Sequence, residues 1–249
     1  MLFVTEIFPI MSLPFRHAAY FAPALKSQAW DLGSQWLGRC ARNSTPLYSP
    51  RFENISSELF DNLTSTPRLY GWHATLKAPF ELNTNIRLEE LRTAFKQLAD
   101  NTPEAFHLPL KLVELGDFFA LVPSQASPEL HRFAERCVKE LHPFALPLSE
   151  SELQRRTGAG LTARQKELLD EWGYPFVMDQ FQFHLTLSGS LKHVDHQVKE
   201  DFKTAAQSWY APLLENGLFI DSVSWFTQDQ KNSDFRWVER FEFGKTNCV

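Results

Sequence analysis

Short blocks of apolar residues recur along this chain with two different spacings, and the spacings predict strands and helices in mixed order. Alternating or continuous apolar runs typical of strands occupy 17–22, 68–76, 106–115, 118–122, 180–187, 218–226 and 235–243. Apolar residues at helical spacing occupy 25–37, 87–100, 128–141, 162–172 and 195–210. Strands in hairpin-like pairs mixed with helices predict an α+β fold with largely antiparallel sheets.

The two halves of the chain follow the same order of predicted elements. The segment FFALVPS at 118–124 resembles AAYFAPA at 18–24, and a predicted helix follows each. This parallel predicts a duplicated unit.

A tetrapeptide of the form H-x-T-L occurs once in each half, and the two copies are 111 positions apart. In a strand, alternate side chains point to the same face. His73 and Thr75 therefore share one face of the first predicted strand, and His184 and Thr186 share one face of the second. If the duplicated strands lie side by side, two imidazoles and two hydroxyls line one cleft.

The same alternation adds two more candidates to the polar faces. Lys77 follows Thr75 on the first strand, and Ser188 follows Thr186 on the second. A simpler interpretation also exists for each, since Lys77 is compatible with a solvated strand end and Ser188 with the start of a Ser-Gly-Ser turn.

Two histidines in one cleft suit acid and base catalysis on a phosphodiester. Histidine titrates near neutrality, so one imidazole can accept a proton while the other donates one. Threonine hydroxyls can hold the non-bridging phosphate oxygens, and this chemistry requires no metal. The alternative interpretation is that the histidines are hydrogen-bonded core residues and the threonines reflect the strand preference of Thr.

The residues around these motifs resemble a known superfamily. The paired H-x-T-L strands, with the phrases YGWHATLKAPF, RQKELLDEWGYPFV and FQFHLTLSGSL, resemble the two-histidine (2H) phosphoesterases, which include LigT-like RNA 2′,3′-cyclic phosphodiesterases. They look like a bacterial branch often encoded near phosphonate-utilisation genes. The resemblance covers about 15–243.

The resemblance implies a fold and a set of site residues. The fold is a single bilobal domain over 15–249, with two concave, mostly antiparallel sheets around a central cleft, helices outside, and lobes of about 15–116 and 117–249. Residues 1–14 are then an N-terminal arm or a start-site artefact. The implied site residues are the catalytic pair His73 and His184 and the phosphate ligands Thr75 and Thr186, together with Tyr20, Arg155 and Arg156. For Tyr20 an ordinary packing role, and for the arginines a solvent-exposed loop, are the alternatives.

The composition and charge of the chain limit the classes of molecule that it is expected to bind. Hydrophobic residues make up 43% and aromatic residues 14%, which excludes a disordered chain. The formal net charge of −5 disfavours long DNA or RNA as a partner. Three cysteines without paired spacing, a start that lacks a cationic leader, and no apolar run of about 18 residues predict a cytoplasmic protein without a membrane partner.

No metal or cofactor is predicted. His193 and His196 flank Asp195 at a spacing that places both histidines on one helix face, but the pattern lacks a third ligand. The start of a surface helix is the favoured interpretation.

These observations lead to one hypothesis with alternatives. The protein is expected to be a metal-independent phosphodiesterase that opens a small cyclic phosphate, such as a nucleoside 2′,3′-cyclic phosphate, to a phosphomonoester. The resemblance to the phosphonate-associated branch implies a ribose 1,2-cyclic phosphate as a further candidate substrate. A 2′-5′ RNA ligase and a nucleotide- or phosphosugar-binding module without turnover are the alternatives. Which histidine is the base, and whether 143–160 closes over the cleft, stay open.

Overall fold

The structure is a computed structural model that describes residues 14–157 and 160–244. Of the arm predicted at 1–14, all but Pro14 lies outside the described residues.

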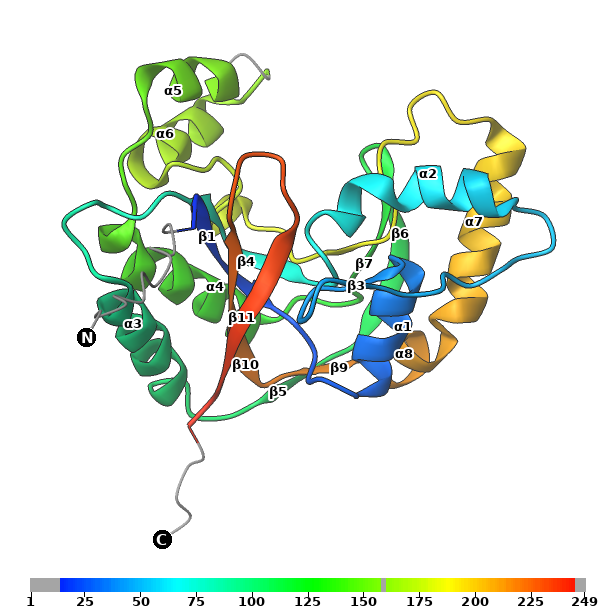
Figure 1. Ribbon diagram of the computed structural model, residues 1–249, viewed down its shortest axis with the longest axis horizontal. Helices are drawn as coiled ribbons and strands as arrows, with labels where there is room; N and C mark the ends of the chain where they lie inside the picture. Colours follow the sequence, from blue (N-terminus) through cyan, green and yellow to red (C-terminus); the bar gives the residue numbers. More distant parts are fainter. Residues whose placement is uncertain (1–13, 158–159, 245–249) are drawn as a thin grey trace, which may run out of the picture.

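Strands and helices occur in mixed order along the described chain (Figure 1). The strands are β1 (Arg16–Phe21), β2 (Arg39–Cys40), β3 (Thr45–Pro46), β4 (Ala74–Phe80), β5 (Phe106–Leu108), β6 (Leu110–Leu115), β7 (Phe118–Pro123), β8 (Leu185–Thr186), β9 (Leu218–Ile220), β10 (Ser222–Gln228) and β11 (Phe235–Glu242). The helices are α1 (Gln28–Trp36), α2 (Ser57–Arg68), α3 (Leu88–Asp100), α4 (Pro128–Leu141), α5 (Glu150–Thr157), α6 (Ala163–Trp172), α7 (His196–Trp209) and α8 (Ala211–Asn216), with 3-10 turns η1 (His142–Phe144) and η2 (Met178–Gln180).

The central feature is one seven-stranded sheet with the order β11-β10-β1-β4-β8-β7-β6. Its strand pairs are antiparallel, so the predicted α+β class with antiparallel sheets is confirmed. The two halves of the sheet meet at β4 and β8, where Ala74 pairs with Leu185. The strands therefore form one continuous sheet across the centre, whereas two separate sheets were expected.

The order of strands reflects the repeat seen in the sequence. In the first half β1 precedes α1 and β4 precedes α3, and in the second β7 precedes α4 and β8 precedes α7. In the sheet, β1 lies beside β4 as β7 lies beside β8. The last strand of each repeat crosses over, because β10 pairs with β1 and β6 pairs with β7. The two H-x-T-L segments consequently meet at the centre.

Helices cover the two ends of the sheet with separate aromatic packing. On one side of the view in Figure 1, α3 and α4 lie against the sheet, and on the other lie α1, α2, α7 and α8. Phe95 of α3 stacks on Trp225 of β10 at 5.9 Å between ring centroids. Trp36 of α1 meets Phe60 of α2 and Phe202 of α7 edge-on. Burying such large side chains supplies much of the folding free energy.

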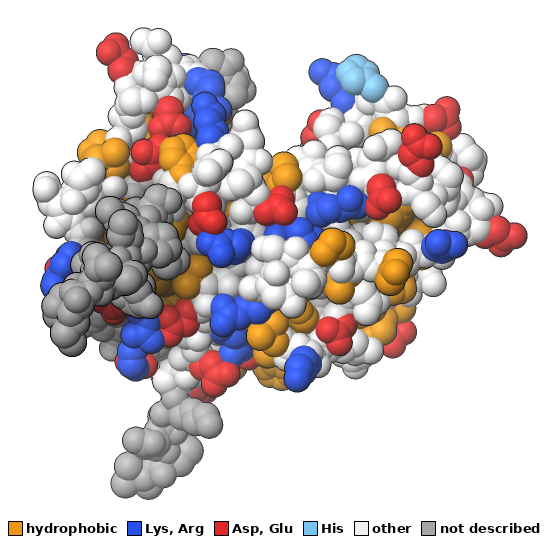
Figure 2. Space-filling model, viewed as in Figure 1, with side chains coloured by type: hydrophobic (Ala, Val, Ile, Leu, Met, Phe, Trp, Pro, Cys, Tyr) orange, Lys and Arg blue, Asp and Glu red, His pale blue; other side chains and the backbone are white. Residues whose placement is uncertain are grey.

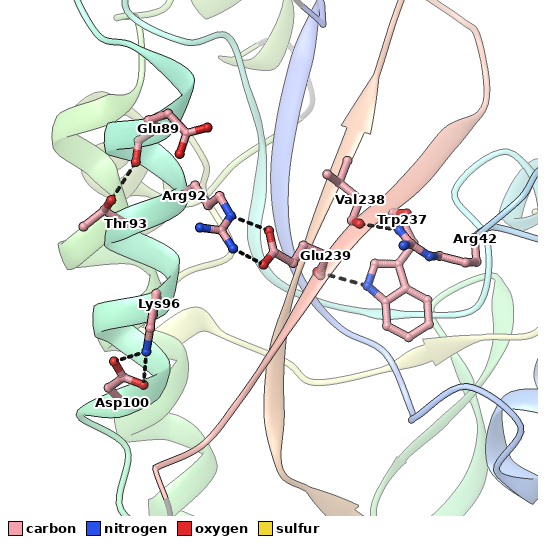
Figure 3. A network of polar contacts seen from close by, with 9 residues as sticks. All are labelled: Arg42, Glu89, Arg92, Thr93, Lys96, Asp100, Trp237, Val238 and Glu239. Carbon is pink, nitrogen blue, oxygen red and sulfur yellow. Dashed lines mark hydrogen bonds and ion pairs between the residues drawn. The ribbon is translucent and has the colours of Figure 1, made fainter.

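Polar contacts tie the edge strand β11 to its surroundings (Figure 3). Arg92 of α3 binds both carboxylate oxygens of Glu239, at 2.8 and 2.7 Å. On the other flank Arg42 donates to the carbonyl oxygens of Trp237 and Val238. Edge strands tend to pair with other chains, and these contacts occupy β11 within its own fold.

Three helices, α2, α5 and α8, were not expected. No helix was predicted over the residues of α2, yet a helix forms there and runs through Pro67. Proline has no N–H to donate, so the carbonyl of Leu63 is free of that bond. It accepts instead from the backbone N–H of Gly189, at 2.7 Å. Helix α5 was also missed, because none of its side chains is buried and its sequence lacks an apolar stripe.

Several predicted strands are shorter or divided. The strand expected from 68 begins at Ala74, since α2 extends to Arg68 and residues 69–73 form the turn and loop that follow it. The strand expected over 180–187 shrinks to Leu185–Thr186, after a 3-10 turn at Met178–Gln180. Both histidines therefore lie at the entrance of a strand rather than inside one.

No helix among the described residues is both long and apolar enough to cross a membrane.

Candidate functional site

The two histidines of the repeated motif are held in the same way. The Nδ1 atom of His73 lies 2.8 Å from the carbonyl oxygen of Gly71, and that of His184 lies 2.8 Å from the carbonyl oxygen of Gln182. A carbonyl oxygen can only accept, so Nδ1 carries the proton in each ring. The neutral tautomer leaves Nε2 of both imidazoles free to accept a proton.

Ring contacts fix the orientation of each imidazole. Tyr20 of β1 stacks on His73, with centroids 3.9 Å apart and an interplanar angle of 30°. Phe118 lies 5.7 Å from the ring of His184. Thr75 completes the first motif, since its hydroxyl lies 3.3 Å from Nε2 of His73 and donates to it. The Nε2 atom of His73, which is the atom that can accept a proton, is thus already hydrogen-bonded to a hydroxyl.

Burial makes both imidazoles weak bases in the free protein. Desolvation lowers the pKa of His73 to about 4, with a smaller lowering from the charge of His184, while the bond to Gly71 acts in the opposite direction. The pKa of His184 is also lowered by burial, and its bond to Gln182 opposes this. An anionic ligand beside the rings would favour the protonated form and raise both pKa values.

The motif residues line a cavity of about 600 Å³, a size that suits a small organic ligand. Figure 2 shows the molecule hollowed at the top of the view, between the part formed by α5 and α6 and the part that carries the loop before α7. The described lining contains neither Asp nor Glu, although acidic residues outnumber basic ones in the whole chain. With histidine and arginine in its wall, the cavity suits an anion.

The structure brings most of the predicted site residues to this cavity. Those that line it are Tyr20, His73, Thr75, Arg156, His184, Thr186 and Ser188. Lys77 and Arg155 do not line it.

Lys77 is turned away from the cavity by a β-bulge. Successive pairs between β1 and β4 shift register on both sides of Lys77, so strict alternation from Thr75 fails. The side chain is buried instead, with Nζ 5.1 Å from the ring centroid of Phe80, and burial lowers its pKa to about 8. The sequence-based expectation that it shares a face with His73 was wrong.

The two adjacent arginines separate. Arg155 is exposed and faces Glu152 at 3.5 Å, whereas Arg156 reaches the cavity and donates from Nη1 to the carbonyl oxygen of Gly173 at 2.6 Å. Neighbouring residues on a helix point in directions about 100° apart, so only one of the pair can face the cavity.

Ser188 has a structural task within the site. Its hydroxyl accepts from the backbone N–H of Phe119 at 3.0 Å and donates to the carbonyl of Gly189 at 2.9 Å. These bonds extend the contact between β7 and the chain beyond the two-residue β8. The hydroxyl of Thr186, in contrast, makes no hydrogen bond with the described residues.

Sequence reasoning missed Arg16, Tyr70 and Tyr174, which also line the cavity. Arg16 donates from Nε and Nη2 to Oε1 of Gln228, at 2.9 and 2.6 Å. Arg16 lies at the beginning of the strand that carries Tyr20, four residues away. The period-two alternation that links positions 16, 18 and 20 to one face was the signal that could have found it.

Among the residues that the structure describes, no group of three His, Cys, Asp or Glu side chains is gathered as a metal site. His193 and His196 are exposed, and Asp195 caps the first turn of α7 by accepting from the N–H of Gln197. The predicted surface helix start is therefore confirmed.

The fold and the site define a duplicated α+β chain with paired histidines facing an anion-compatible cavity. The chain belongs to the family described as "Protein of unknown function (DUF1045)", whose model matches residues 75–236. The match includes His184 and both motif threonines.

Two curated relatives carry the same name. The chain is 33% identical over 229 residues to "Ribose 1,5-bisphosphate phosphokinase PhnN" of Janthinobacterium sp. (strain Marseille), covering 92% of this chain and 51% of the relative. It is 36% identical over 221 residues to the protein of that name from Laribacter hongkongensis (strain HLHK9), covering 89% of this chain and 50% of the relative. The chain thus spans about half the length of these relatives.

A solved structure titled "Crystal structure of phosphoesterase" aligns with 93% of this chain and 100% of its own, at 11% identity and a TM-score of 0.39. A score this low is insufficient to establish a shared fold.

Proposed function

We propose that the protein is a phosphodiesterase that opens a small cyclic phosphate to a phosphomonoester by two-histidine acid and base catalysis. The observation that carries this proposal is the matched pair of imidazoles: each has Nδ1–H fixed on the carbonyl two residues earlier, and both line one cavity. This arrangement leaves two Nε2 atoms for proton transfer at one ligand.

In the proposed reaction a water molecule attacks phosphorus. One imidazole, neutral at Nε2, takes the proton from the water as the new P–O bond forms. The other, protonated at Nε2, gives its proton to the ring oxygen as the old P–O bond breaks. The products are one phosphomonoester with a free hydroxyl, and the proton passes from one histidine to the other overall.

The hydroxyls of Thr75 and Thr186 are assigned to the non-bridging oxygens. Thr75 already donates to Nε2 of His73 at 3.3 Å and can turn to the phosphate when it binds. Donors directed at an oxygen that gains charge in the transition state lower the barrier by a few kcal/mol each.

The names of the relatives favour a ribose phosphate as substrate. If a ribose 1,2-cyclic phosphate that also carries a 5-phosphate is opened at the bond to O2, the product is ribose 1,5-bisphosphate. That compound is the substrate in the name of both relatives. We propose that this chain corresponds to the half of such proteins that supplies the bisphosphate, and that the cytoplasm is the place of action.

The experiment is turnover of a panel of ribose 1,2-cyclic phosphates and nucleoside 2′,3′-cyclic phosphates in EDTA, followed by phosphorus NMR. Conversion of one compound to a single monoester is expected, and the product identifies the bond that breaks. A parallel sample with ATP, Mg²⁺ and ribose 1,5-bisphosphate tests for a kinase. Phosphoryl transfer there, without hydrolysis in the panel, would refute the proposal.

A further inference from the structure

A second cationic centre shares the cavity with the histidines. Arg16 and Arg156 both line the cavity, from β1 and from α5. Burial is the main cause of the lowered pKa of Arg156; the charge of Glu152 opposes it, and the charges of Arg155 and Arg16 add to it, so Arg16 lies within electrostatic range of Arg156. Figure 2 shows Lys or Arg side chains on the α5 side of the hollow.

Neither guanidinium forms an ion pair within the described residues, although Glu152, the partner of Arg155, acts on Arg156 from beyond ion-pair distance. Most arginines of the described chain have an Asp or Glu oxygen within 4.0 Å, as Arg155 has Glu152. Arg16 and Arg156 form no such pair within the described residues, and the cavity wall carries no acid. Two like charges within electrostatic range of each other and without an ion-pair partner are unfavourable, and an anion between them removes that cost.

Both side chains are held by neutral partners that leave donors free. Arg16 uses Nε and Nη2 on Gln228, and its guanidinium lies 5.8 Å from the ring centroid of Phe235. Arg156 uses Nη1 on the carbonyl of Gly173. Each arginine therefore keeps N–H groups for a phosphate, and the anchoring reduces the entropy lost on binding.

Arg16 is anchored away from His73 along β1. Tyr20, which stacks on His73, is four residues from Arg16 on β1, and four residues of strand span about 13 Å. Gln228, which pairs with Arg16 in the sheet, holds the guanidinium at that end. The guanidinium of Arg16 is therefore held on the β1 end of the cavity wall, within reach of a second group on a ligand whose cyclic phosphate lies on the histidines.

We infer that Arg16 and Arg156 form a subsite for a second phosphate, so that the preferred ligand is a cyclic phosphate that also carries a phosphomonoester. The placement of the cyclic phosphate on the histidines rests on the proposed function, whereas the placement of the phosphomonoester on the arginines does not. The phosphomonoester lies on the arginines while the cyclic phosphate lies on the histidines.

The test compares two matched pairs of compounds. One pair is ribose 1,2-cyclic phosphate with and without a 5-phosphate, and the other is adenosine 2′,3′-cyclic phosphate with and without a 5′-phosphate. In the wild type we expect the added phosphate to raise kcat/KM by about tenfold or more in at least one pair, since charge-assisted hydrogen bonds are of that strength. The pair in which the added phosphate raises kcat/KM shows whether the preferred ligand is a sugar phosphate or a nucleotide.

Variants assign the effect to the arginines. Arg16→Gln and Arg156→Gln are each expected to bring the ratio of the two kcat/KM values towards one, while Arg155→Gln, the exposed neighbour, keeps the wild-type ratio. The inference is overturned if the wild-type ratio is one in both pairs, or if both arginine variants slow the two members of a pair equally.

A binding measurement separates this inference from the proposed function. Calorimetry with ribose 5-phosphate should show binding to the wild type and to His73→Asn, and affinity at least about tenfold weaker in Arg16→Gln and Arg156→Gln. If this pattern appears without turnover of any cyclic phosphate, the subsite stands and the hydrolase fails. If the affinity is the same in all variants, the subsite fails regardless of turnover.

Discussion

His73 and His184 show how a backbone carbonyl can select the tautomer that the proposed reaction requires. Each ring donates Nδ1–H to the residue two positions earlier, so the strand entrance itself directs Nε2 into the cavity. Burial then lowers the pKa of both rings. In the free protein at neutral pH, few molecules therefore carry the imidazole proton that the proposed reaction gives to the departing oxygen. An anionic ligand raises the imidazole pKa and so increases the protonated fraction.

This scarcity predicts a pH dependence of kcat/KM, which reports groups of the free enzyme. Because both imidazole pKa values lie below about 6.5, the form with one proton on the pair decreases about tenfold per pH unit above that value. We expect kcat/KM to fall with this slope between about pH 7 and 9, measured with the best substrate of the panel.

Lys77 provides the control for this profile, because its lowered pKa of about 8 lies in the same range. Lys77→Met should keep the slope, since the side chain is outside the cavity. A profile that is flat or rises across this range would show that the histidine pair is not the proton source.

At the scale of elements, short strands are compensated by contacts from distant helices. β8 has only two residues, but Trp36 of α1 donates from Nε1 to the carbonyl of Leu187 at 2.8 Å. The backbone N–H of Gly189 donates to the carbonyl of Leu63 in α2, which lacks its usual helical donor because of Pro67. The second motif is thus positioned by helices of the first half of the chain.

Close packing of α1 on Trp72, two residues before β4, positions the first motif and gives the second prediction. A Cβ atom on Gly33 would lie 2.0 Å from the indole of Trp72, the residue directly before His73. Gly→Ala inside a helix normally stabilises a protein. Here we expect Gly33→Ala to lower the free energy of unfolding by about 1–3 kcal/mol and to lower kcat/KM as His73 shifts.

Urea unfolding checks this prediction, with Gln35→Ala as the exposed control on the same helix. The control should change the free energy of unfolding by less than about 0.5 kcal/mol. Equal stability of Gly33→Ala and wild type would mean that α1 does not constrain Trp72.

Local patterns predicted the elements that have their own signals. Helix α4 occupies the range expected from its apolar stripe, and β1 and β7 follow from their apolar runs. The H-x-T-L repeat predicted the central pair of histidines. Each of these signals lies within a few residues of the chain.

The features that the sequence did not reveal depend on tertiary contacts. The bulge that turns Lys77 away is set by pairing with β1. Helix α2 continues through Pro67 because Gly189 satisfies the open carbonyl. A period or a motif contains no record of such partners.

At the scale of the whole molecule, buried neutral histidines predict loss of stability in acid. Burial lowers the pKa of His17 and of His73 to about 4, while an unfolded histidine has a pKa near 6.5. The unfolded chain takes up protons first, so this stability is complete above about pH 6.5 and is lost as the pH falls towards 4. At pH 5 each of these two histidines lowers the free energy of unfolding by about 2 kcal/mol.

Urea unfolding at pH 7 and at pH 5 measures this loss. The Nδ1 atom of His17 accepts a hydrogen bond from Nε1–H of Trp225, at 3.1 Å. His17→Gln should reduce the difference between the two pH values by about 2 kcal/mol, whereas His193→Gln, on the surface, should leave it unchanged. The same difference in wild type and His17→Gln would contradict the assignment.

The central claim is that two imidazoles from the two halves of the chain act on one phosphate. The most direct measurement is the turnover rate of the best cyclic phosphate with wild type, His73→Asn, His184→Asn and the double variant, all with folding confirmed. Groups that act as a unit are not additive, so each single variant should lose about a thousandfold or more and the double variant little beyond that. Retention of near-wild-type turnover by either single variant would contradict the claim.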